Sequence, residues 1–279
     1  MSRIHDQTAC TLGEGPLWHP EREELFWFDI LGRRLHTRGR HWQFDEHVSA
    51  AGWLDRDSLL IASETALFRF DLRSGTREDV CPLEADDPVT RSNDGRADPW
   101  GGFWIGTMGK GAEREAGAIY RYFRGELRRL FAPLTITNAI CFSPDRRFAY
   151  FADTPARRIM RQPLAERDGW PDGDPEPWLD LSQDALNPDG AVTDAKGNLW
   201  NAQWGAGRVA CYAPDGRFLR AVAFPAPQTT CPAFGGPGLT TLFCTSAAEG
   251  LEDAPGPDHG KTFAADDVTP GVPEPRVIL

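Results

Sequence analysis

The stretch that decides the fold is Asn187-Pro188-Asp189-Gly190-Ala191-Val192-Thr193-Asp194-Ala195-Lys196-Gly197-Asn198-Leu199-Trp200. An acid stands in a tight Pro-Asp-Gly turn, an apolar pair follows, and a second Asp/Gly turn precedes an apolar and aromatic run. Short apolar runs bounded by such turns are typical of β-strands in an all-β protein. The stretch therefore predicts two short strands, each introduced by a turn.

Looser copies of this unit recur along the chain, each with a carboxylate or amide at the same place. They are Glu14-Gly15-Pro16-Leu17-Trp18, Asn93-Asp94-Gly95-Arg96-Ala97-Asp98-Pro99 and Asn138-Ala139-Ile140-Cys141-Phe142-Ser143-Pro144-Asp145. When the units are aligned, their anchors fall at Gly15, Gly52, Gly95, Ala139, Gly190 and Pro232, 37 to 51 residues apart. Six such units in 279 residues suit the four-stranded blades of a β-propeller.

The composition agrees with many short strands, since 28 Gly and 23 Pro punctuate the 279 residues. An eight-stranded α/β barrel is the rival fold at this length, but it needs amphipathic helices that the sequence does not offer. We therefore predict an all-β, six-bladed β-propeller, formed as a single domain by residues 1–279. Its last blade should be closed by a strand from the N-terminal part of the chain. The stretch 167–180 should be a surface loop in blade four, and the tail 271–278 should lie at the outer edge.

Charge and cysteine content restrict the partners and the compartment. A net charge of −11 argues against nucleic acid and anionic membranes, because phosphate binding needs stripes of Lys and Arg. No apolar run approaches the ~20 residues of a membrane span, and residues 1–6 lack the apolar core of a signal peptide. None of the six cysteines forms a Cys-x-x-Cys pair, so we expect reduced thiols in a cytoplasmic protein.

Equivalent positions of successive blades converge on the central channel of a propeller, so Glu14, Asn138 and Asp189 should share one centre. Two carboxylates and an amide form an all-oxygen set suited to one divalent cation completed by water. Ca²⁺, Zn²⁺, Mn²⁺, Mg²⁺ and Fe²⁺ all accept such a set, so the residues leave the ion open. Asp and Asn are also ordinary turn formers, which is the alternative reading of each residue alone.

Arg91 and Asn93 form a further polar pair on the blade between Gly52 and Ala139. Residues two apart on a strand point the same way, so together they could bind hydroxyls or a carbonyl of a polar ligand. A surface arginine beside an Asx-turn is the alternative. His36, His41 and His47 match no familiar ligand spacing, and a solvated loop is expected there. Neither a Gly-x-Ser-x-Gly elbow nor a Gly-rich phosphate loop is present.

The ordered motifs resemble the regucalcin/gluconolactonase (senescence marker protein-like) family of six-bladed, metal-dependent sugar lactonases. The matching segments run from residue 12 to about residue 250: Leu12-Gly13-Glu14-Gly15-Pro16, Asn93–Pro99 with Phe103–Met108, Thr137-Asn138 with Ser143-Pro144-Asp145, Pro188-Asp189-Gly190 through Ala202, Gly207-Arg208-Val209, and Thr229-Thr230-Cys231 with Phe234-Gly235-Gly236. Each match is short, and it is their common order that makes the resemblance specific.

The resemblance implies that Glu14, Asn138 and Asp189 bind the divalent metal and that Arg91 and Asn93 contact a sugar lactone. It also implies that Asp189 is the general base or orients the attacking water. Ala139 departs from the family, which usually has Gly after the ligand Asn, and this departure could shift the local backbone.

A second departure lies three positions after Gly-Thr-Met, where some members of the family carry a substrate-binding acid. The residue in this chain is Gly111, with Glu113 and Glu115 nearby, so substrate choice is more open than metal binding.

We expect hydrolysis of an aldonolactone to its aldonic acid, as in a gluconolactonase or pentonolactonase. Two alternatives stay open: a non-catalytic metal- or metabolite-binding propeller, and a phosphotriester or aryl-ester hydrolase on the same fold. The sequence leaves the particular lactone and the oligomeric state open.

Overall fold

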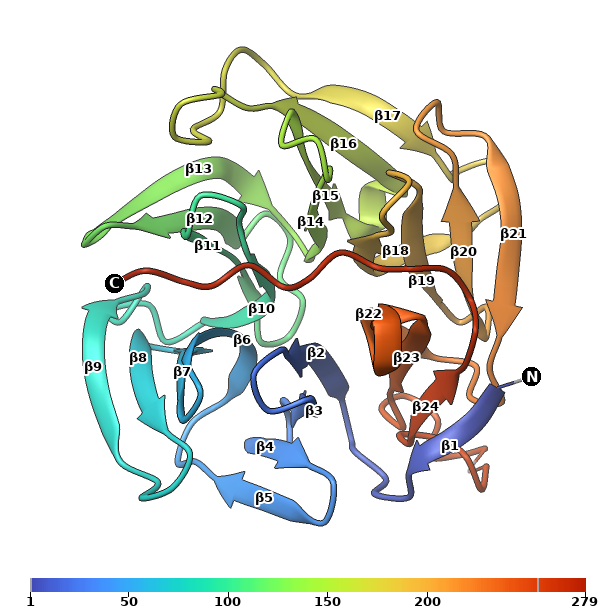
Figure 1. The fold of residues 1–279 in the computed structure, drawn as a ribbon, viewed down its shortest axis with the longest axis horizontal. Helices are drawn as coiled ribbons and strands as arrows, with labels where there is room; N and C mark the ends of the chain where they lie inside the picture. The colour runs from blue at the N-terminus through green and yellow to red at the C-terminus, as the bar shows by residue number, and fades with distance from the viewer. Residues whose placement is uncertain (1, 255) are drawn as a thin grey trace.

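Six four-stranded antiparallel sheets surround a common centre (Figure 1). The computed structural model describes residues 2–254 and 256–279. In five sheets the strands follow chain order from the centre outward, and in the sixth the outermost strand comes from the start of the chain. The six-bladed β-propeller predicted from the repeats is confirmed. In the described residues the helices are two short 3₁₀ segments, η1 (Thr154–Ala156) and η2 (Pro237–Leu239), so the α/β barrel is rejected.

The blades are numbered in chain order, and the strands of each blade run from the centre of the ring to its rim. Blade one has β2 (Gly13–His19), β3 (Glu24–Asp29), β4 (Arg34–Thr37) and β5 (Arg40–Gln43). Blade two has β6 (Val48–Asp55), β7 (Ser58–Ser63), β8 (Ala66–Asp71) and β9 (Arg77–Pro82). Blade three has β10 (Thr90–Ala97), β11 (Phe103–Gly109), β12 (Gly117–Phe123) and β13 (Glu126–Leu134).

The second half of the ring continues the same order. Blade four has β14 (Thr137–Phe142), β15 (Phe148–Asp153), β16 (Arg158–Pro163) and β17 (Glu176–Asp180). Blade five has β18 (Asn187–Thr193), β19 (Leu199–Trp204), β20 (Arg208–Tyr212) and β21 (Phe218–Ala223). Blade six has β22 (Thr229–Gly235), β23 (Thr241–Ser246), β24 (Thr262–Ala265) and β1 (Ser2–Asp6).

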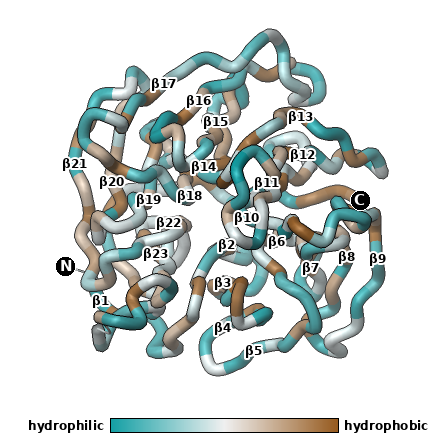
Figure 2. Tube along the Cα trace, turned by 180° about the vertical axis from the view of Figure 1, so that it is seen from behind, coloured by the Kyte–Doolittle hydropathy of each residue, from teal (hydrophilic) through white to brown (hydrophobic). Residues whose placement is uncertain are grey.

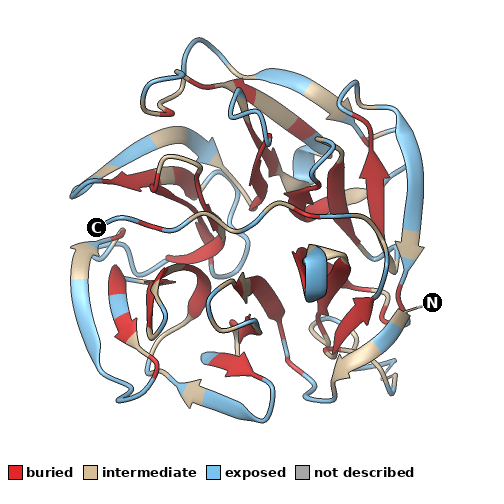
Figure 3. Ribbon diagram, viewed as in Figure 1, coloured by how far each residue is buried: buried red, intermediate tan, exposed pale blue. Residues whose placement is uncertain are grey.

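Burial falls from the centre of the ring to its rim (Figure 3). Every residue of β7 and β11 is buried, because neighbouring blades cover both faces of these second strands. The outermost strands, such as β21, are mostly exposed. Trp27, Trp104 and Trp200 lie on second strands and are buried between blades, as core residues. Figure 2 shows the opposite face of the ring, with β2, β10, β14 and β18 around its centre.

Each innermost strand contains a β-bulge where the sequence suggests a turn. Along β2 the pairing moves from Glu14 to Leu17, whereas the partner strand moves only from Phe28 to Phe26. A single extra residue also occurs in β10, β14, β18 and β22, and β6 has two such shifts. The repeated unit is therefore a bulged strand, and the prediction of a turn before the strand is wrong. A bulge breaks the alternation of side chains and can turn one of them toward the channel.

The ring closes in blade six, where β1 pairs with β24 and Ser2 lies opposite Ala265. This confirms the predicted closure by a strand from the N-terminal part. In blade four, residues 167–175 form the expected loop, but β17 occupies the rest of the predicted loop. No helix in the described part of the chain has the length and apolarity needed to cross a membrane.

The C-terminal tail does not lie at the outer edge, contrary to the sequence-based expectation. It runs across one face of the ring, over the central channel (Figure 1). Val277 is buried and its N–H donates to the Trp53 carbonyl oxygen at 3.0 Å, while the Trp53 indole Nε1 donates to the Glu274 carbonyl oxygen at 2.9 Å. The Glu274 carboxylate pairs with Arg96 inside the channel. Apolar burial and this buried ion pair hold the tail in place.

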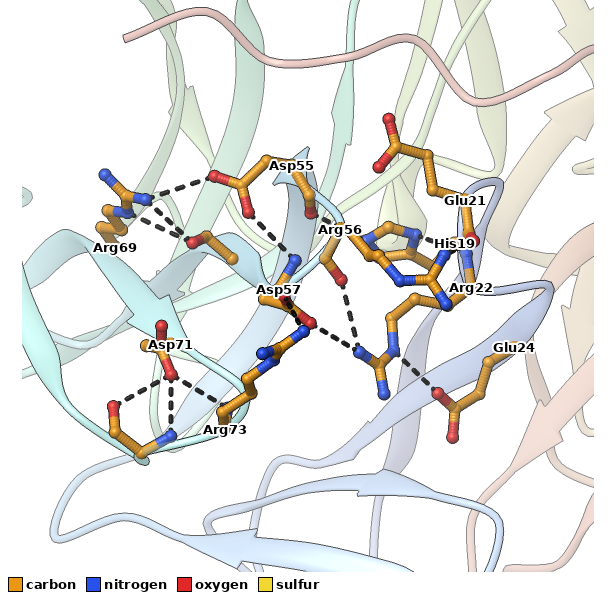
Figure 4. Close-up of polar contacts among 12 residues, drawn as sticks. His19, Glu21, Arg22, Glu24, Asp55, Arg56, Asp57, Arg69, Asp71 and Arg73 are labelled. Carbon is orange, nitrogen blue, oxygen red and sulfur yellow. Dashed lines mark hydrogen bonds and ion pairs between the residues drawn. The ribbon is translucent and has the colours of Figure 1, made fainter.

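A polar network joins blades one and two on the face that carries the tail (Figure 4). Arg22 Nη1 lies 3.1 Å from Asp57 Oδ1, and His19 Nε2 lies 3.0 Å from the Asp55 carbonyl oxygen. Arg56 Nη1 donates to the Glu21 carbonyl oxygen at 2.6 Å. Partly exposed ion pairs contribute only about 0–1 kcal/mol each, so this network aligns the two blades more than it stabilises them.

Candidate active site

A cavity of about 660 Å³ opens at the end of the channel away from the tail, and all five residues predicted for the site line it. Its lining also includes residues from strand ends and connecting segments of several blades, among them Leu12, Met108, Lys110, Gly111, Ile136, Thr154, Trp204, Gln228 and Glu249. The inner strands of blades one, three, four and five thus deliver Glu14, Arg91 with Asn93, Asn138 and Asp189 to one place. The convergence expected from the repeat is present.

Glu14 and Asp189 are two buried carboxyl groups in close electrostatic contact, each about 5% exposed. Glu14 Oε2 accepts the N–H of Gly15 at 2.9 Å, and Asp189 Oδ1 accepts the N–H of Gly190 at 3.0 Å. Burial, with a further contribution from Asp94, raises the pKa of Glu14 to about 8. Burial and the neighbouring Glu14 raise the pKa of Asp189 well above its usual value. The pair thus resists full ionisation unless positive charge is added next to it.

Asn138 presents its carbonyl oxygen to the same centre because of its neighbour Thr154. The Thr154 hydroxyl donates to the Pro188 carbonyl oxygen at 2.8 Å, so its oxygen is left to accept a hydrogen bond. Asn138 Nδ2 donates to that oxygen at 2.9 Å. The amide oxygen Oδ1 therefore faces the other way, where Asn93 Nδ2 lies 3.3 Å from it. This small network orients an oxygen ligand without any charge.

Ala139 adopts a left-handed backbone with φ of 58°, close to the 52° of Gly15 in the first blade. Ala139 thus adopts the positive φ that is more usual for glycine. A non-glycine residue in this region costs about 1 kcal/mol. The bulges after Glu14 and Asn138 accordingly share one conformation although only one of them has a glycine.

Arg91 and Asn93 lie side by side on β10, and Arg91 Nη1 donates to Asn93 Oδ1 at 2.8 Å. Asn93 Nδ2 also donates to the Thr137 carbonyl oxygen at 2.8 Å. Arg91 lines the cavity and is about 5% exposed, and its Nε is buried without a hydrogen-bond partner. The surface arginine that the sequence left as an alternative is excluded by this burial.

An acidic residue missed by sequence reasoning, Glu249, lines the cavity on the loop after β23. Burial raises its pKa, and the charge of Arg91 acts in the opposite direction. Gly111 lines the cavity as well, but Glu113 is exposed and its Oε2 accepts the Gly111 N–H at 2.9 Å. Besides Glu14 and Asp189, the acidic residue that lines the cavity is therefore Glu249. No motif surrounds it that could have identified it in the sequence.

Asp94 and Arg96 occupy the channel between the cavity and the tail. Asp94 Oδ2 accepts the Ile140 N–H at 2.7 Å, and burial raises the Asp94 pKa to about 6. Arg96 Nη2 donates to the carbonyl oxygens of Ala191 and Pro232 at 3.3 and 3.4 Å. Both residues belong to the Asn93-Asp94-Gly95-Arg96 motif, so their position next to Asn93 was the available signal.

The expected solvated histidine loop is wrong for His36 and His41. They lie on β4 and β5, directly opposite each other across the hairpin, and His36 is about 5% exposed. All six cysteines are free, as expected, and five of them are buried. Neither these two histidines nor the cysteines line the cavity.

The donor set fits a divalent cation. Glu14 and Asp189 supply two carboxylates in a buried place, and their raised pKa values show that the surrounding residues do not neutralise both charges. Asn138 adds a neutral oxygen held by Thr154. Hard, all-oxygen sets of this kind are those that Ca²⁺ and Mg²⁺ prefer, and Zn²⁺ and Mn²⁺ accept them.

Comparison with known proteins extends over almost the whole chain. A putative sugar lactone lactonase of Rhizobium meliloti (strain 1021) is 42% identical over 272 residues, covering 94% of this chain and 92% of the relative. The L-arabinolactonase of Azospirillum brasilense is 39% identical over 272 residues, covering 92% and 89%. The crystal structure of a calcium-binding protein, regucalcin, from Agrobacterium tumefaciens str. C58 superposes with a TM-score of 0.97 at 42% identity, covering 100% of this chain and 98% of that one.

The family match is equally broad, because it spans residues 12–248 and so includes every residue of the predicted metal and substrate set. Together with the propeller and the cavity, it shows that the chain belongs to the SMP-30/gluconolactonase/LRE-like family.

Proposed function

We propose that the chain, acting as one six-bladed unit, is a metal-dependent lactonase that hydrolyses a sugar lactone to the aldonic acid. The observation that carries the proposal is the pair of buried carboxyl groups, Glu14 and Asp189, in one cavity with the Asn138 amide and the Arg91 guanidinium. Relatives 42% and 39% identical are named as lactonases of sugars, which supports the substrate class.

Glu14, Asn138 and Asp189 would hold the cation, with their oxygens directed into the cavity. A divalent ion there would supply Lewis acidity toward the lactone carbonyl and stabilise the charge that develops on its oxygen. Asp189 would accept the proton of the attacking water. Its Oδ1 accepts the Gly190 N–H, so Oδ2 is the oxygen that would accept this proton.

Arg91, Asn93 and Glu249 would bind the hydroxyl groups of the sugar. Arg91 offers the positive charge of its guanidinium group, and Glu249 offers acceptor oxygens from the opposite blade of the ring. Trp204 lines the cavity beside them and provides an apolar surface for a ring face. A polyhydroxylated ligand needs this mixture of donors, acceptors and apolar wall.

The experiment measures acid release from a panel of aldonolactones in weakly buffered indicator, with spontaneous hydrolysis subtracted. Metal-stripped protein is used, and Ca²⁺, Zn²⁺, Mn²⁺, Mg²⁺ and Fe²⁺ are added back one at a time. We expect turnover that depends on an ion, and we expect Asp189→Asn to lose both ion binding and turnover. Glu78→Gln, at an exposed position of the outermost strand β9, is the matched control and should keep both.

A second candidate is a non-catalytic cation-binding propeller, favoured by the description of the Agrobacterium tumefaciens relative as a calcium-binding protein. Tight ion binding without hydrolysis of any lactone would support this candidate and overturn the lactonase. Faster turnover of phosphotriesters or aryl esters than of aldonolactones would move the assignment to an esterase on the same fold.

A further inference from the structure

A second group of metal-ligating side chains lies outside the channel, at the junction of blades six and one. Cys10, Asp29 and His36 each place one ligand atom within 4.8 Å of the other two, and all three residues are buried. Cys10 lies in the linker from β1 to β2, Asp29 ends β3, and His36 is on β4. Among residues 2–254 and 256–279 it is the one group of three or more His, Cys, Asp or Glu with this spacing.

We propose that Cys10, Asp29 and His36 form a transition-metal site of the Zn²⁺ class, distinct from the oxygen site in the channel. Thiolate, imidazole and carboxylate are the three ligand types of Zn²⁺ in proteins, and a tetrahedral ion leaves the fourth position for water. Tetrahedral bonds of about 2.0–2.3 Å put ligand atoms roughly 3.3–3.6 Å apart, so the three atoms need to draw in by no more than about 1.5 Å.

The fixed ring orientation and the unpartnered ring nitrogen of His36 suit a metal ligand. Its ring stacks on Trp27 with centroids 5.6 Å apart and planes at 13°, which fixes its orientation. Its Nε2 is buried and has no hydrogen-bond partner. An Nε2 without a partner is free to take part in metal binding, and imidazole binds metals in its neutral form.

Asp29 is held in place by the backbone and still has a ligand position to offer. Its Oδ1 accepts the N–H groups of Leu12 and Gly32, each at 3.0 Å, while Oδ2 accepts only that of Thr11, at 3.1 Å. A carboxylate has about four acceptor positions, so one remains at Oδ2. Such outer hydrogen bonds are the usual means of orienting a metal-binding carboxylate.

Cys10 would bind as a thiolate, which makes the whole site electrically neutral. Its pKa is raised by burial and by Asp29, so without a metal the thiol keeps its proton. Binding of the ion forms the sulfur–metal bond and releases that proton to solvent, and the two anionic ligands then balance the two positive charges. The ionised sulfur would also accept the indole N–H of Trp27, whose Nε1 is buried without a partner.

The site would tie the closing strand to the first blade. The Cys10 N–H donates to the Gly260 carbonyl oxygen at 3.0 Å, next to blade six, whereas Asp29 and His36 belong to blade one. The exposed His41 lies beside His36, with ring centroids 5.7 Å apart, so only one side chain separates His36 from the surface on this side. An ion at this junction would stabilise ring closure, in addition to any stabilisation by an ion in the channel.

The test titrates the full-length, metal-stripped protein with Co²⁺, which reports sulfur ligation by a thiolate-to-cobalt charge-transfer band in the near ultraviolet. We expect the band to reach its full intensity within two equivalents of Co²⁺, because the channel can take one of them, and we expect Zn²⁺ to abolish it. The double variant Glu14→Gln/Asp189→Asn, which disables the channel set, should keep the band. Cys10→Ser should lose it, and Cys81→Ser, at a half-exposed thiol, is the matched control that should keep it.

Thermal unfolding supplies a second readout. Saturating Zn²⁺ should raise Tm of the channel double variant by about 5 °C or more, and this shift should vanish when His36→Gln is added. Absence of the band in the wild-type protein would overturn the proposal without any variant. Persistence of the band in Cys10→Ser, or its loss in the channel double variant, would overturn it as well.

Discussion

Replacement of Glu14 by Gln should stabilise the metal-stripped protein while abolishing ion binding in the channel. Burial raises the Glu14 pKa from 4.5 to about 8. The folded carboxyl group therefore keeps its proton between these pH values, whereas the unfolded one has released it. The folded state binds more protons, so the free energy of unfolding of the apoprotein falls as pH rises from 4.5 to about 8.

The magnitude follows from the size of the shift. At about 1.36 kcal/mol per pKa unit, Glu14 lowers the stability of the apoprotein by about 3 kcal/mol at pH 7 and by about 5 kcal/mol above pH 8. Gln has nearly the same shape, cannot ionise, and its amide oxygen can still accept the Gly15 N–H. The variant should therefore match the wild type near pH 4.5 and exceed it by several kcal/mol at pH 8.

The assay is urea unfolding of metal-stripped protein at pH 5, 6, 7 and 8, with tryptophan fluorescence as the signal. The control variant Glu78→Gln, at an exposed position of the outermost strand β9, should follow the wild type at every pH. Isothermal titration with Ca²⁺ and Zn²⁺ completes the comparison, and Glu14→Gln should show no channel binding. A variant that is no more stable than the wild type at pH 8, with the same dependence on pH, would refute the electrostatic reasoning.

Three further predictions concern the backbone, the tail and the substrate. Gly15→Ala should lower the free energy of unfolding by more than about 3 kcal/mol, because a Cβ there would collide with the Ser49 carbonyl oxygen. At Gly39 a Cβ meets nothing within 4 Å, so Gly39→Ala should cost only about 1 kcal/mol. Equal losses of stability in urea unfolding would contradict the collision. Arg96→Met should lower the free energy of unfolding by about 3 kcal/mol, because it leaves the Glu274 carboxylate without its partner. Adding Glu274→Gln should recover part of this stability. Strict additivity of the two changes in a double-mutant cycle would contradict the pairing. Glu249→Gln should raise KM for polyhydroxylated lactones about tenfold with little change in kcat; an unchanged KM across the panel would remove Glu249 from the substrate site.

The repeat in the sequence was sufficient to predict the fold, because every blade needs the same strand lengths and turns. It also predicted which side chains converge, since Glu14, Asn138 and Asp189 occupy corresponding stretches of inner strands. The predicted turn was wrong, because Pro188-Asp189-Gly190 forms a bulge within β18. A one-residue bulge uses the same residue types as a turn, so the sequence does not distinguish the two.

Other features depend on contacts between distant parts of the chain, which no local pattern encodes. Glu249 reaches the cavity because blade six faces blade three. The tail covers the channel because Val277 hydrogen-bonds to Trp53 and Glu274 pairs with Arg96. His36 joins Cys10 and Asp29 only after the linker from β1 has packed on blade one. Spacing along the sequence could not have identified any of these three arrangements.

Because Ser2 pairs with Ala265, the last blade cannot be completed until β24 has been synthesised. Strand β1 leaves the ribosome first and must wait for β24, which lies near the other end of the chain, before it has a partner. During that interval both β1 and the growing ring expose unpaired strand edges, the state in which chains associate with one another. Contacts between such distant residues also slow folding. Nascent chains should therefore depend on chaperones until the last blade is made, and a chain stopped before β24 should aggregate rather than form a five-bladed ring.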